Sequence, residues 1–328
     1  MHSHAPSPDA ARHAAAVAPL PAARWQRGET VLVVLLLPLL LAAAALGVLS
    51  RAQEALLFHP TPLPAEYRPA LDGVDEVWVE VDGARLHGLL LRRPGARGLV
   101  FYLHGNAGNV ADWLSDAALY RRAGYDVFVL DYRGFGKSSG SITSEAQWHA
   151  DVRAAWEQVA PAYAGRLRVI AGRSIGTGPA ARLAASVEAD AESDLRADLL
   201  VLVSPFASLR RLVGERAPLL PARVLRYPLP VEQWVAAIRT PLLIVHSEDD
   251  QTIPMAHVER LLQVRPDAEL ARLRGVGHND LQRDPAYARA LARRLEVLAG
   301  GGVAPPASIR GKDRELRRVP MSAAQNGP

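Results

Sequence analysis

Residues 168–180, RVIAGRSIGTGPA, restrict the fold of this 328-residue chain more than any other segment. An apolar strand is expected over Val169–Ala171, an alanine-rich helix is expected directly afterwards, and the sequence GRSIG, centred on Ser174, lies between them. A serine at the apex of such a sharp strand-to-helix turn is strained, and its hydroxyl is exposed. The glycine on each side lets the two backbones approach closely. The segment therefore predicts a reactive serine at position 174.

The chain around this turn predicts an α/β domain. From residue 72 onward, apolar runs typical of buried parallel strands alternate with helical stretches. An Asp-Gly turn signal joins the first two strands in a hairpin. We expect one domain at 72–299, with a mostly parallel eight-stranded sheet and helices on both faces. The expected strands are Val74–Val81, Arg85–Leu91, Leu99–Leu103, Val127–Leu130, Val169–Ala171, Leu199–Val203, Leu242–Val245 and Glu269–Leu273.

An apolar run precedes this domain. Residues 31–49, VLVVLLLPLLLAAAALGVL, contain no charge, and a helix of this length covers roughly the 30 Å of bilayer hydrocarbon. Pro38 and Gly47 are tolerated in a membrane helix. We therefore expect an N-terminal transmembrane helix at 30–50, and a signal segment, cleaved near Ala42–Ala45 or retained, is the alternative. A buried helix of a soluble domain is the third interpretation.

The arginines around the apolar run bear on its orientation. Arg12, Arg24 and Arg27 precede it, and Arg51 and Arg68 follow it. This slight excess before the run favours a single-pass membrane protein with its N-terminus inside and its catalytic domain on the non-cytoplasmic side.

The tails and the composition set further limits. Residues 1–29, rich in Ala, Pro and His, and the basic, Gly/Pro-rich residues 300–328 are expected to be disordered. The net charge is +4, from 38 basic and 34 acidic residues, which is too balanced to predict a nucleic-acid partner. The absence of cysteine excludes disulfides, thiolate metal sites and a cysteine nucleophile.

Between residues 206 and 240 the alternation of strands and helices stops. Prolines interrupt short apolar pieces, and arginines make the segment basic. We expect a small lid inserted after the sixth strand. The arginines are typical of a solvated face, and attraction to an anionic membrane surface is the alternative. The residues concerned are Pro218, Pro221, Pro228, Pro230, Arg210, Arg211, Arg216, Arg223 and Arg226.

Candidate partners for the serine follow later strands. A serine hydroxyl becomes a nucleophile when a histidine takes its proton and a carboxylate orients that histidine. Glu248, Asp249 and Asp250 follow the seventh expected strand, and His278 lies on a glycine-containing loop after the last one. The order serine, acid, histidine is the one required in a sheet of this kind. His257, the nearest other histidine, is expected on a helix and facing solvent.

Acyl transfer also requires an oxyanion hole, in which each backbone N–H donor typically lowers the barrier by about 3–4 kcal/mol. The expected donors are Ile175, directly after the serine, and Asn106, in the loop of LVFYLHGNAGN. Residues 176–181 also match a dinucleotide G-x-G-x-x-A, but the first glycine closes the serine turn, and no second strand ends in an acidic residue at the required distance. No cofactor and no metal is predicted, and His2 and His4 are interpreted as incidental.

Five motifs occur in a fixed order along the chain. They are HGNAGN (104–109), LDYRGFGKS (130–138), GRSIGTG (172–178), HSEDDQTIP (246–254) and GVGHND (275–280). Together they resemble the α/β-hydrolase superfamily, and most closely its membrane-anchored α/β-hydrolase domain serine hydrolases, the branch that contains protein depalmitoylases. The resemblance covers about residues 72–299 and implies the α/β-hydrolase fold.

The resemblance also implies roles for single residues. It selects Asp250 as the acid, because Asp250 begins an Asp-x-x-Ile-Pro run. It implies that His104, Asp131 and Arg133 shape loops and do not catalyse. The cysteine cluster that anchors the animal depalmitoylases is absent here, and the apolar run takes its place.

Together these features predict a serine hydrolase that cleaves carboxylic ester or thioester bonds through a Ser174–Asp250–His278 triad. The expected partners are a small or lipid-like acyl substrate and a membrane. A serine aminopeptidase of the prolyl type is one alternative, although such enzymes usually carry a larger helical cap. A catalytically inactive α/β-hydrolase scaffold is the other, although such scaffolds usually lack a triad member.

Overall fold

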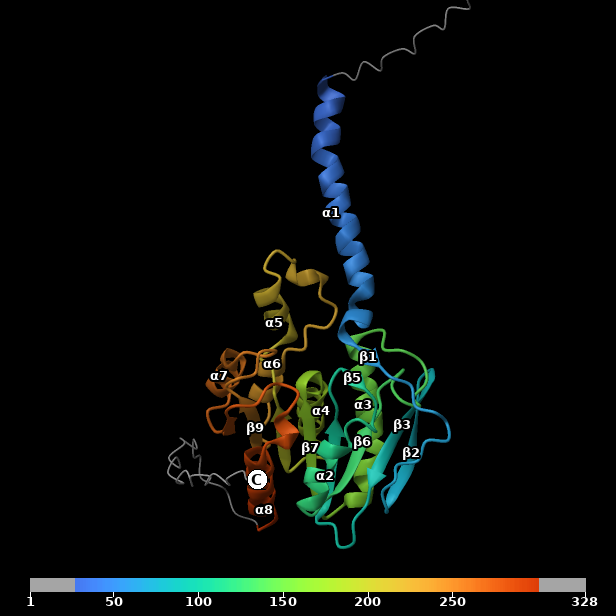
Figure 1. The fold of residues 1–328 in the computed structure, drawn as a ribbon, viewed down its shortest axis with the longest axis vertical. Coiled ribbons are helices and arrows are strands. Elements are labelled where there is room, and N and C mark those ends of the chain that lie inside the picture. The colour runs from blue at the N-terminus through green and yellow to red at the C-terminus, as the bar shows by residue number, and fades with distance from the viewer. Residues whose placement is uncertain (1–26, 301–328) are drawn as a thin grey trace, which may run out of the picture. The chain divides into compact units, whose positions relative to one another are not determined.

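The computed structural model describes residues 27–300, in two units that divide between Leu49 and Ser50 (Figure 1). The first unit contains most of helix α1 (Arg27–Leu57). Val34–Leu57, which contains an 18-residue window with a mean hydropathy of 2.1, is long and apolar enough to cross a membrane, and no other helix in the described part of the chain meets this criterion. The helix continues past the predicted residue 50 because RAQEALL, at 51–57, consists of good helix formers. Both predicted disordered tails lie almost entirely outside the described residues.

The second unit is built on an eight-stranded sheet with the strand order β10-β9-β8-β7-β4-β6-β3-β2. The pairs β2–β3 and β3–β6 are antiparallel, and every other pair is parallel. This confirms the predicted mostly parallel eight-stranded sheet. The strands are β2 (Val74–Val81), β3 (Ala84–Leu91), β4 (Gly98–Leu103), β6 (Asp126–Leu130), β7 (Leu167–Arg173), β8 (Leu199–Val203), β9 (Leu242–Ser247) and β10 (Glu269–Leu273).

Helices cover both faces of this sheet, as predicted. Neighbouring residues of a strand point to opposite faces, so Phe101 lies in one apolar cluster with α3 and α4, and Tyr102 lies in another with α2 and α8. The helices are α2 (Leu114–Arg122), α3 (Glu145–Val159), α4 (Thr177–Ala189), α5 (Leu209–Arg216), α6 (Val231–Ala236), α7 (Met255–Val264) and α8 (Pro285–Ala299). Short 3-10 turns are η1 (Ala160–Tyr163), η2 (Ser174–Gly176), η3 (Ala222–Val224) and η4 (Leu281–Arg283).

A small parallel sheet lies beside the main one. Strand β1 (His59–Pro60), directly after α1, pairs with β5 (Ala107–Gly108) in the loop that follows β4. This pairing ties the segment after the apolar helix to the loop predicted to hold the oxyanion.

The connection from β8 to β9, called the β8–β9 segment below, contains α5, η3 and α6. No residue from 210 to 226 is buried, whereas Tyr227, Leu229 and Val231 are buried in the core. The exposed part of the segment is therefore shorter than the lid predicted at 206–240. This exposed part contains five arginines and two prolines, and the buried part packs α6 against α4.

Candidate active site

Ser174 lies at a sharp turn between β7 and α4. Its φ angle is 52°, in the left-handed region that costs a non-glycine residue about 1–3 kcal/mol. A Cβ at Gly172 would lie 2.4 Å from the Gly176 carbonyl oxygen, and a Cβ at Gly176 would lie 2.3 Å from the Leu103 carbonyl oxygen. Only glycine therefore fits at positions 172 and 176, because the backbones of β7, η2 and β4 approach closely there.

Hydrogen bonds connect Ser174 with two other predicted site residues. His278 Nε2 lies 2.9 Å from Ser174 Oγ, and His278 Nδ1 lies 2.7 Å from Asp250 Oδ2. The other carboxylate oxygen, Oδ1, accepts the N–H groups of Thr252 and Ile253, each at 2.8 Å. An imidazole protonated at Nδ1 donates to Asp250 and presents its Nε2 lone pair to the hydroxyl, as a general base must.

The electrostatics of Asp250 suit an orienting carboxylate. Burial raises the pKa of Asp250, but the hydrogen bonds from His278 and from the Ile253 N–H lower it, and the pKa lies below its ordinary value. The carboxylate is therefore ionised at neutral pH, and its charge stabilises a protonated imidazole beside it.

The two neighbouring acidic side chains have other partners. Asp249 Oδ2 accepts the N–H of Gly275 at 2.6 Å, and Glu248 pairs with Arg272 at 2.9 Å and Arg274 at 2.6 Å. Of the three carboxylates that the residues alone left open, Asp250 is the one hydrogen-bonded to the imidazole of His278.

The predicted oxyanion donors lie beside the serine. Asn106 and Ile175 line the same pocket as Ser174. Ile175 is the second residue of η2, where N–H groups have no partner within the helix. No acceptor contacts the Asn106 N–H within residues 27–300, whereas the Asn106 carbonyl accepts the His59 N–H at 2.8 Å. Both N–H groups are therefore available to a ligand at Ser174.

A pocket of about 360 Å³ opens at Ser174, and most of its wall is apolar. Leu56 and Leu57 of α1 line it together with Leu209 and Leu212 of α5. A concave apolar site with a few polar groups at its base is the usual form of a small-molecule binding site. The remaining apolar side chains of the lining are Ala107, Trp113, Ile175, Phe206 and Ile253.

Arg173 also contacts this site, and the sequence did not predict a role for it. Its side chain is buried and donates to Asp116, to Gln282 at 2.9 Å and to the main-chain carbonyl of His278 at 3.1 Å. Burial lowers the pKa of Arg173, but the nearby Tyr102 and Asp116 raise it above its ordinary value. The guanidinium therefore stays charged and holds the loop that carries His278. The only sequence signal is its position before the serine, at the end of a strand.

His257 corrects one expectation. It was predicted to face solvent, but it is 1% exposed, its Nδ1 accepts the Ala207 N–H at 3.2 Å, and its Nε2 lies 3.1 Å from Glu215. The amphipathic helix α7 turns this histidine toward the β8–β9 segment and away from water. Its partners come from another part of the chain, so the helical pattern alone did not reveal its burial.

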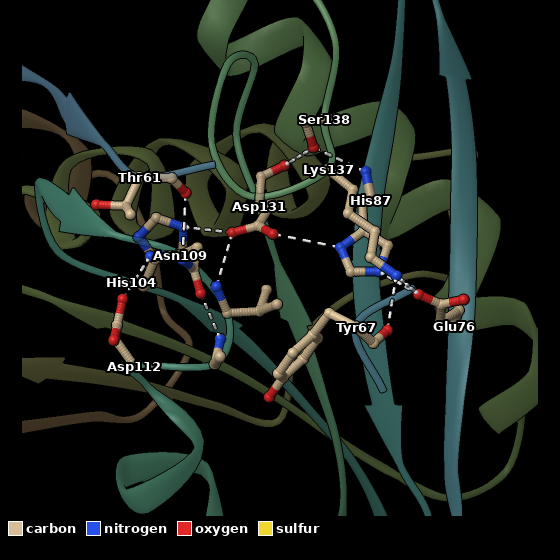
Figure 2. Close-up of polar contacts among 12 residues, drawn as sticks. Thr61, Tyr67, Glu76, His87, His104, Asn109, Asp112, Asp131, Lys137 and Ser138 are labelled. Carbon is tan, nitrogen blue, oxygen red and sulfur yellow. Dashed lines mark hydrogen bonds and ion pairs between the residues drawn. The ribbon is translucent and has the colours of Figure 1, made fainter. Parts of the chain in front are cut away.

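A buried polar network centred on Asp131 contacts the loop that follows β4 (Figure 2). Asp131 Oδ1 accepts the Val110 N–H at 2.8 Å, and Asp131 Oδ2 lies 3.3 Å from His87 Nδ1. His104 Nε2 lies 3.7 Å from Asp131, and burial lowers the pKa of His104, although the nearby Asp131 raises it. Neither His104 nor Asp131 lines the pocket at Ser174. Their contacts fix the backbone around the loop.

No cation site accompanies these residues. Across residues 27–300, the structure contains no group of three His, Asp or Glu side chains that could hold a metal ion.

Comparisons with known proteins agree with this architecture. A family model described as serine aminopeptidase, S33, matches residues 94–231. The α/β-hydrolase domain-containing protein 17C of Xenopus tropicalis is 31% identical over 238 residues, which cover 70% of this chain and 71% of that protein. Protein 17B of Homo sapiens is 32% identical over 197 residues, which cover 58% of this chain and 63% of that protein. An esterase from Pyrococcus furiosus shares the fold, with a TM-score of 0.58 and 20% identity over 74% of this chain and 98% of the esterase.

The fold is therefore that of the α/β-hydrolases, and the chain is a hydrolase. It belongs to the α/β-hydrolase superfamily, in the depalmitoylase-like branch of α/β-hydrolase domain-containing proteins. This confirms the family that the five motifs indicated. The relatives together with the apolar helix α1 suggest association with a membrane.

Proposed function

We propose that the protein is a serine hydrolase that cleaves carboxylic ester or thioester bonds by two-step acyl transfer. The observation that carries the proposal is the unbroken hydrogen-bonded series from Ser174 through His278 to Asp250, of which Ser174 and His278 line an apolar pocket. Each group in this series has the chemistry that its position requires: a hydroxyl, an imidazole and an ionised carboxylate.

In the first step, Ser174 Oγ attacks the substrate carbonyl as its proton passes to His278 Nε2. The oxyanion that forms accepts the N–H groups of Asn106 and Ile175. His278 then gives its proton to the departing alcohol or thiol, and the acyl group remains on Ser174. In the second step, His278 takes a proton from water as the water oxygen attacks the acyl carbonyl. His278 then returns this proton to Ser174 Oγ as the bond between Oγ and the acyl carbon breaks, and the carboxylic acid is released. Asp250 holds the imidazole in the required tautomer throughout.

The lining of the pocket favours esters and thioesters over peptides with a free N-terminus. An aminopeptidase requires acidic groups to hold the substrate amine, and none of the residues that line this pocket is Asp or Glu. The apolar wall suits the hydrocarbon part of an acyl group. The description of the matched family names aminopeptidases, so the amide alternative is included in the test.

This function is tested with matched chromogenic substrates and the full chain in detergent. An acyl p-nitrophenyl ester, an acyl thioester and an aminoacyl p-nitroanilide are compared, with Ser174→Ala as the control. We expect turnover of the ester or thioester and a loss of at least about 10³-fold in the variant. Faster turnover of the anilide would favour the aminopeptidase, and no turnover of any substrate by the wild type would favour the inactive scaffold.

We further propose that α1 crosses a membrane once and that the hydrolase domain lies on the non-cytoplasmic side. The length and hydropathy of Val34–Leu57 support the crossing, and the arginines before the apolar run support the orientation. Because the chain has no cysteine, Ser141→Cys at an exposed position introduces a single thiol. A membrane-impermeant maleimide should label this thiol in intact cells or spheroplasts, and labelling only after lysis would place the domain in the cytoplasm.

A further inference from the structure

The segment directly after the apolar run, Ser50–Thr61, is part of the hydrolase domain and contacts its active site. It contains the last two turns of α1 and strand β1. The sequence predicted only a membrane anchor ending at residue 50, followed by a domain beginning at residue 72. Residues 53–61 instead contact both the β8–β9 segment and the loop that follows β4.

Gln53 fixes the position of the exposed part of the β8–β9 segment. Its side chain is 5% exposed, its Nε2 donates to the Val224 carbonyl at 2.7 Å, and its Oε1 accepts the Arg226 N–H at 2.7 Å. The nitrogen and the oxygen of the Gln53 carboxamide therefore both bind the backbone of residues 224–226. A buried amide whose donor and acceptor are both satisfied defines one geometry, because any slip leaves a polar group unpaired.

Glu54 and Phe58 strengthen this connection. Glu54 accepts the Tyr227 hydroxyl at 2.7 Å and pairs with Arg226 at 2.8 Å. The ring of Phe58 packs edge-on against Tyr227, with 5.6 Å between centroids. The end of α1 and the β8–β9 segment are thereby joined by polar and apolar contacts together.

Leucines of α1 and of the β8–β9 segment line the pocket. Leu56 and Leu57 line the pocket from α1, and Leu209 and Leu212 line it from α5. The side chain of Leu56 is 59% exposed, an exposure that an apolar ligand in the pocket would reduce. At 1.5 Å per residue, Leu56 lies about 9 Å along α1 from Ser50, where the apolar run ends.

The same segment also contacts the loop that follows β4 and contains Asn106. The His59 N–H donates to the Asn106 carbonyl at 2.8 Å, and the Thr61 N–H donates to the Gly108 carbonyl at 2.9 Å. The Thr61 carbonyl accepts the Asn109 side-chain amide at 3.2 Å, as Figure 2 shows. One continuous stretch of nine residues, from Gln53 to Thr61, therefore contributes two leucines to the pocket lining and hydrogen-bonds the loop that contains Asn106.

We propose that this stretch determines the acyl-chain specificity of the enzyme, with Leu56 as the residue that contacts the chain and Gln53 as the positioning residue that sets the width of the pocket. The proposal rests on the proposed acyl hydrolysis at Ser174. The ligand is the hydrocarbon portion of an acyl group long enough to reach from Ser174 to the rim.

The test compares chain-length preference in the full-length protein in detergent. The measured quantity is the ratio of kcat/KM for a dodecanoyl p-nitrophenyl ester to that for the acetyl ester. We expect Leu56→Ala to lower this ratio about tenfold, because several methylenes of the dodecanoyl chain then lose the apolar side chain against which they are buried. Gln53→Ala should lower it in the same direction, mainly through KM of the dodecanoyl ester.

Leu71→Ala is the matched control, because Leu71 is also a largely exposed leucine, 43% exposed, and does not line the pocket. It should leave the ratio unchanged. An unchanged ratio in Leu56→Ala, or equal losses for both chain lengths, would overturn the proposal.

A second readout separates this proposal from the proposed function. Methyl- and dodecyl-fluorophosphonates are compared by their rates of covalent reaction with the same variants. If the wild type hydrolyses neither esters nor thioesters, the proposed function fails, and the ratio of the two labelling rates still tests whether Leu56 contacts the chain. If esters are hydrolysed and neither ratio responds to Leu56→Ala, only the specificity proposal fails.

Discussion

Asp250→Asn is the substitution with the sharpest expected consequence. The variant keeps the size of the side chain, and its amide oxygen can still accept the Thr252 and Ile253 N–H groups in place of Oδ1. The amide nitrogen then replaces Oδ2, 2.7 Å from His278 Nδ1. An N–H donor there favours the imidazole with its proton on Nε2. That proton faces the Ser174 hydroxyl, and the general base has no lone pair to offer.

The expected loss follows from this reversed tautomer. Comparable substitutions in serine hydrolases lower kcat by about 10⁴, which is about 5 kcal/mol of barrier. We expect a loss of about 10³–10⁴ in kcat for Asp250→Asn with little change in the free energy of unfolding. The assay is steady-state hydrolysis of the best ester at pH 8, with thermal unfolding measured on the same preparation.

Asp249→Asn is the matched control. Asp249 accepts the Gly275 N–H at 2.6 Å, and an amide oxygen can still accept this bond, so we expect a loss of less than about tenfold. A larger loss for Asp249→Asn than for Asp250→Asn, with both variants folded, would refute the assignment of the acid. Activity within tenfold of the wild type in Asp250→Asn would refute the tautomer argument itself.

Three further predictions concern stability and positioning. Gly176→Ala would put a Cβ 2.3 Å from the Leu103 carbonyl oxygen, so we expect a loss of at least about 1–3 kcal/mol in denaturant unfolding and no measurable turnover; a variant as stable and active as the wild type would contradict this. Arg173→Met leaves the buried Asp116 carboxylate without its countercharge, with the Tyr102 hydroxyl as a remaining donor, and frees the His278 carbonyl. We expect a loss of about 3–5 kcal/mol of stability, and Arg173→Lys should recover part of it while kcat stays low. Burial lowers the pKa of three histidines: His104, His246 and His257. In the unfolded chain these histidines bind protons near pH 6.5, whereas in the folded protein they bind protons only at lower pH. The free energy of unfolding should therefore be highest above pH 6.5 and decrease below it, by at most about 1.4 kcal/mol per pH unit for each histidine. A constant Tm from pH 8 to 5.5 would contradict this.

Most of the sheet was predictable because buried parallel strands have a local signature. Each run of apolar residues between turn signals corresponds to one strand, and the Asp-Gly pair marks the hairpin of β2 and β3. Strand ends were less predictable. The strand before Ser174 continues through Arg173, because a polar side chain at its end is satisfied by partners on α2 and η4 that no local pattern reveals.

The candidate site likewise combines features that are local in the sequence with features that depend on contacts between distant parts of the chain. The serine turn and the order of the partner loops are local features of the chain. The choice of Asp250 among three adjacent carboxylates required the family motif, because all three follow the strand directly and each could orient a histidine. The pocket wall at Leu56 was not predictable, since it depends on α1 continuing past the apolar run and meeting α5.

The most direct test of the account is covalent labelling of the full chain with a fluorophosphonate probe, followed by digestion and mass spectrometry. The phosphonyl group should be found on Ser174 in the wild type, and Ser174→Ala should carry no label. Labelling of another serine, or labelling that persists in Ser174→Ala, would contradict the assignment of Ser174 as the nucleophile.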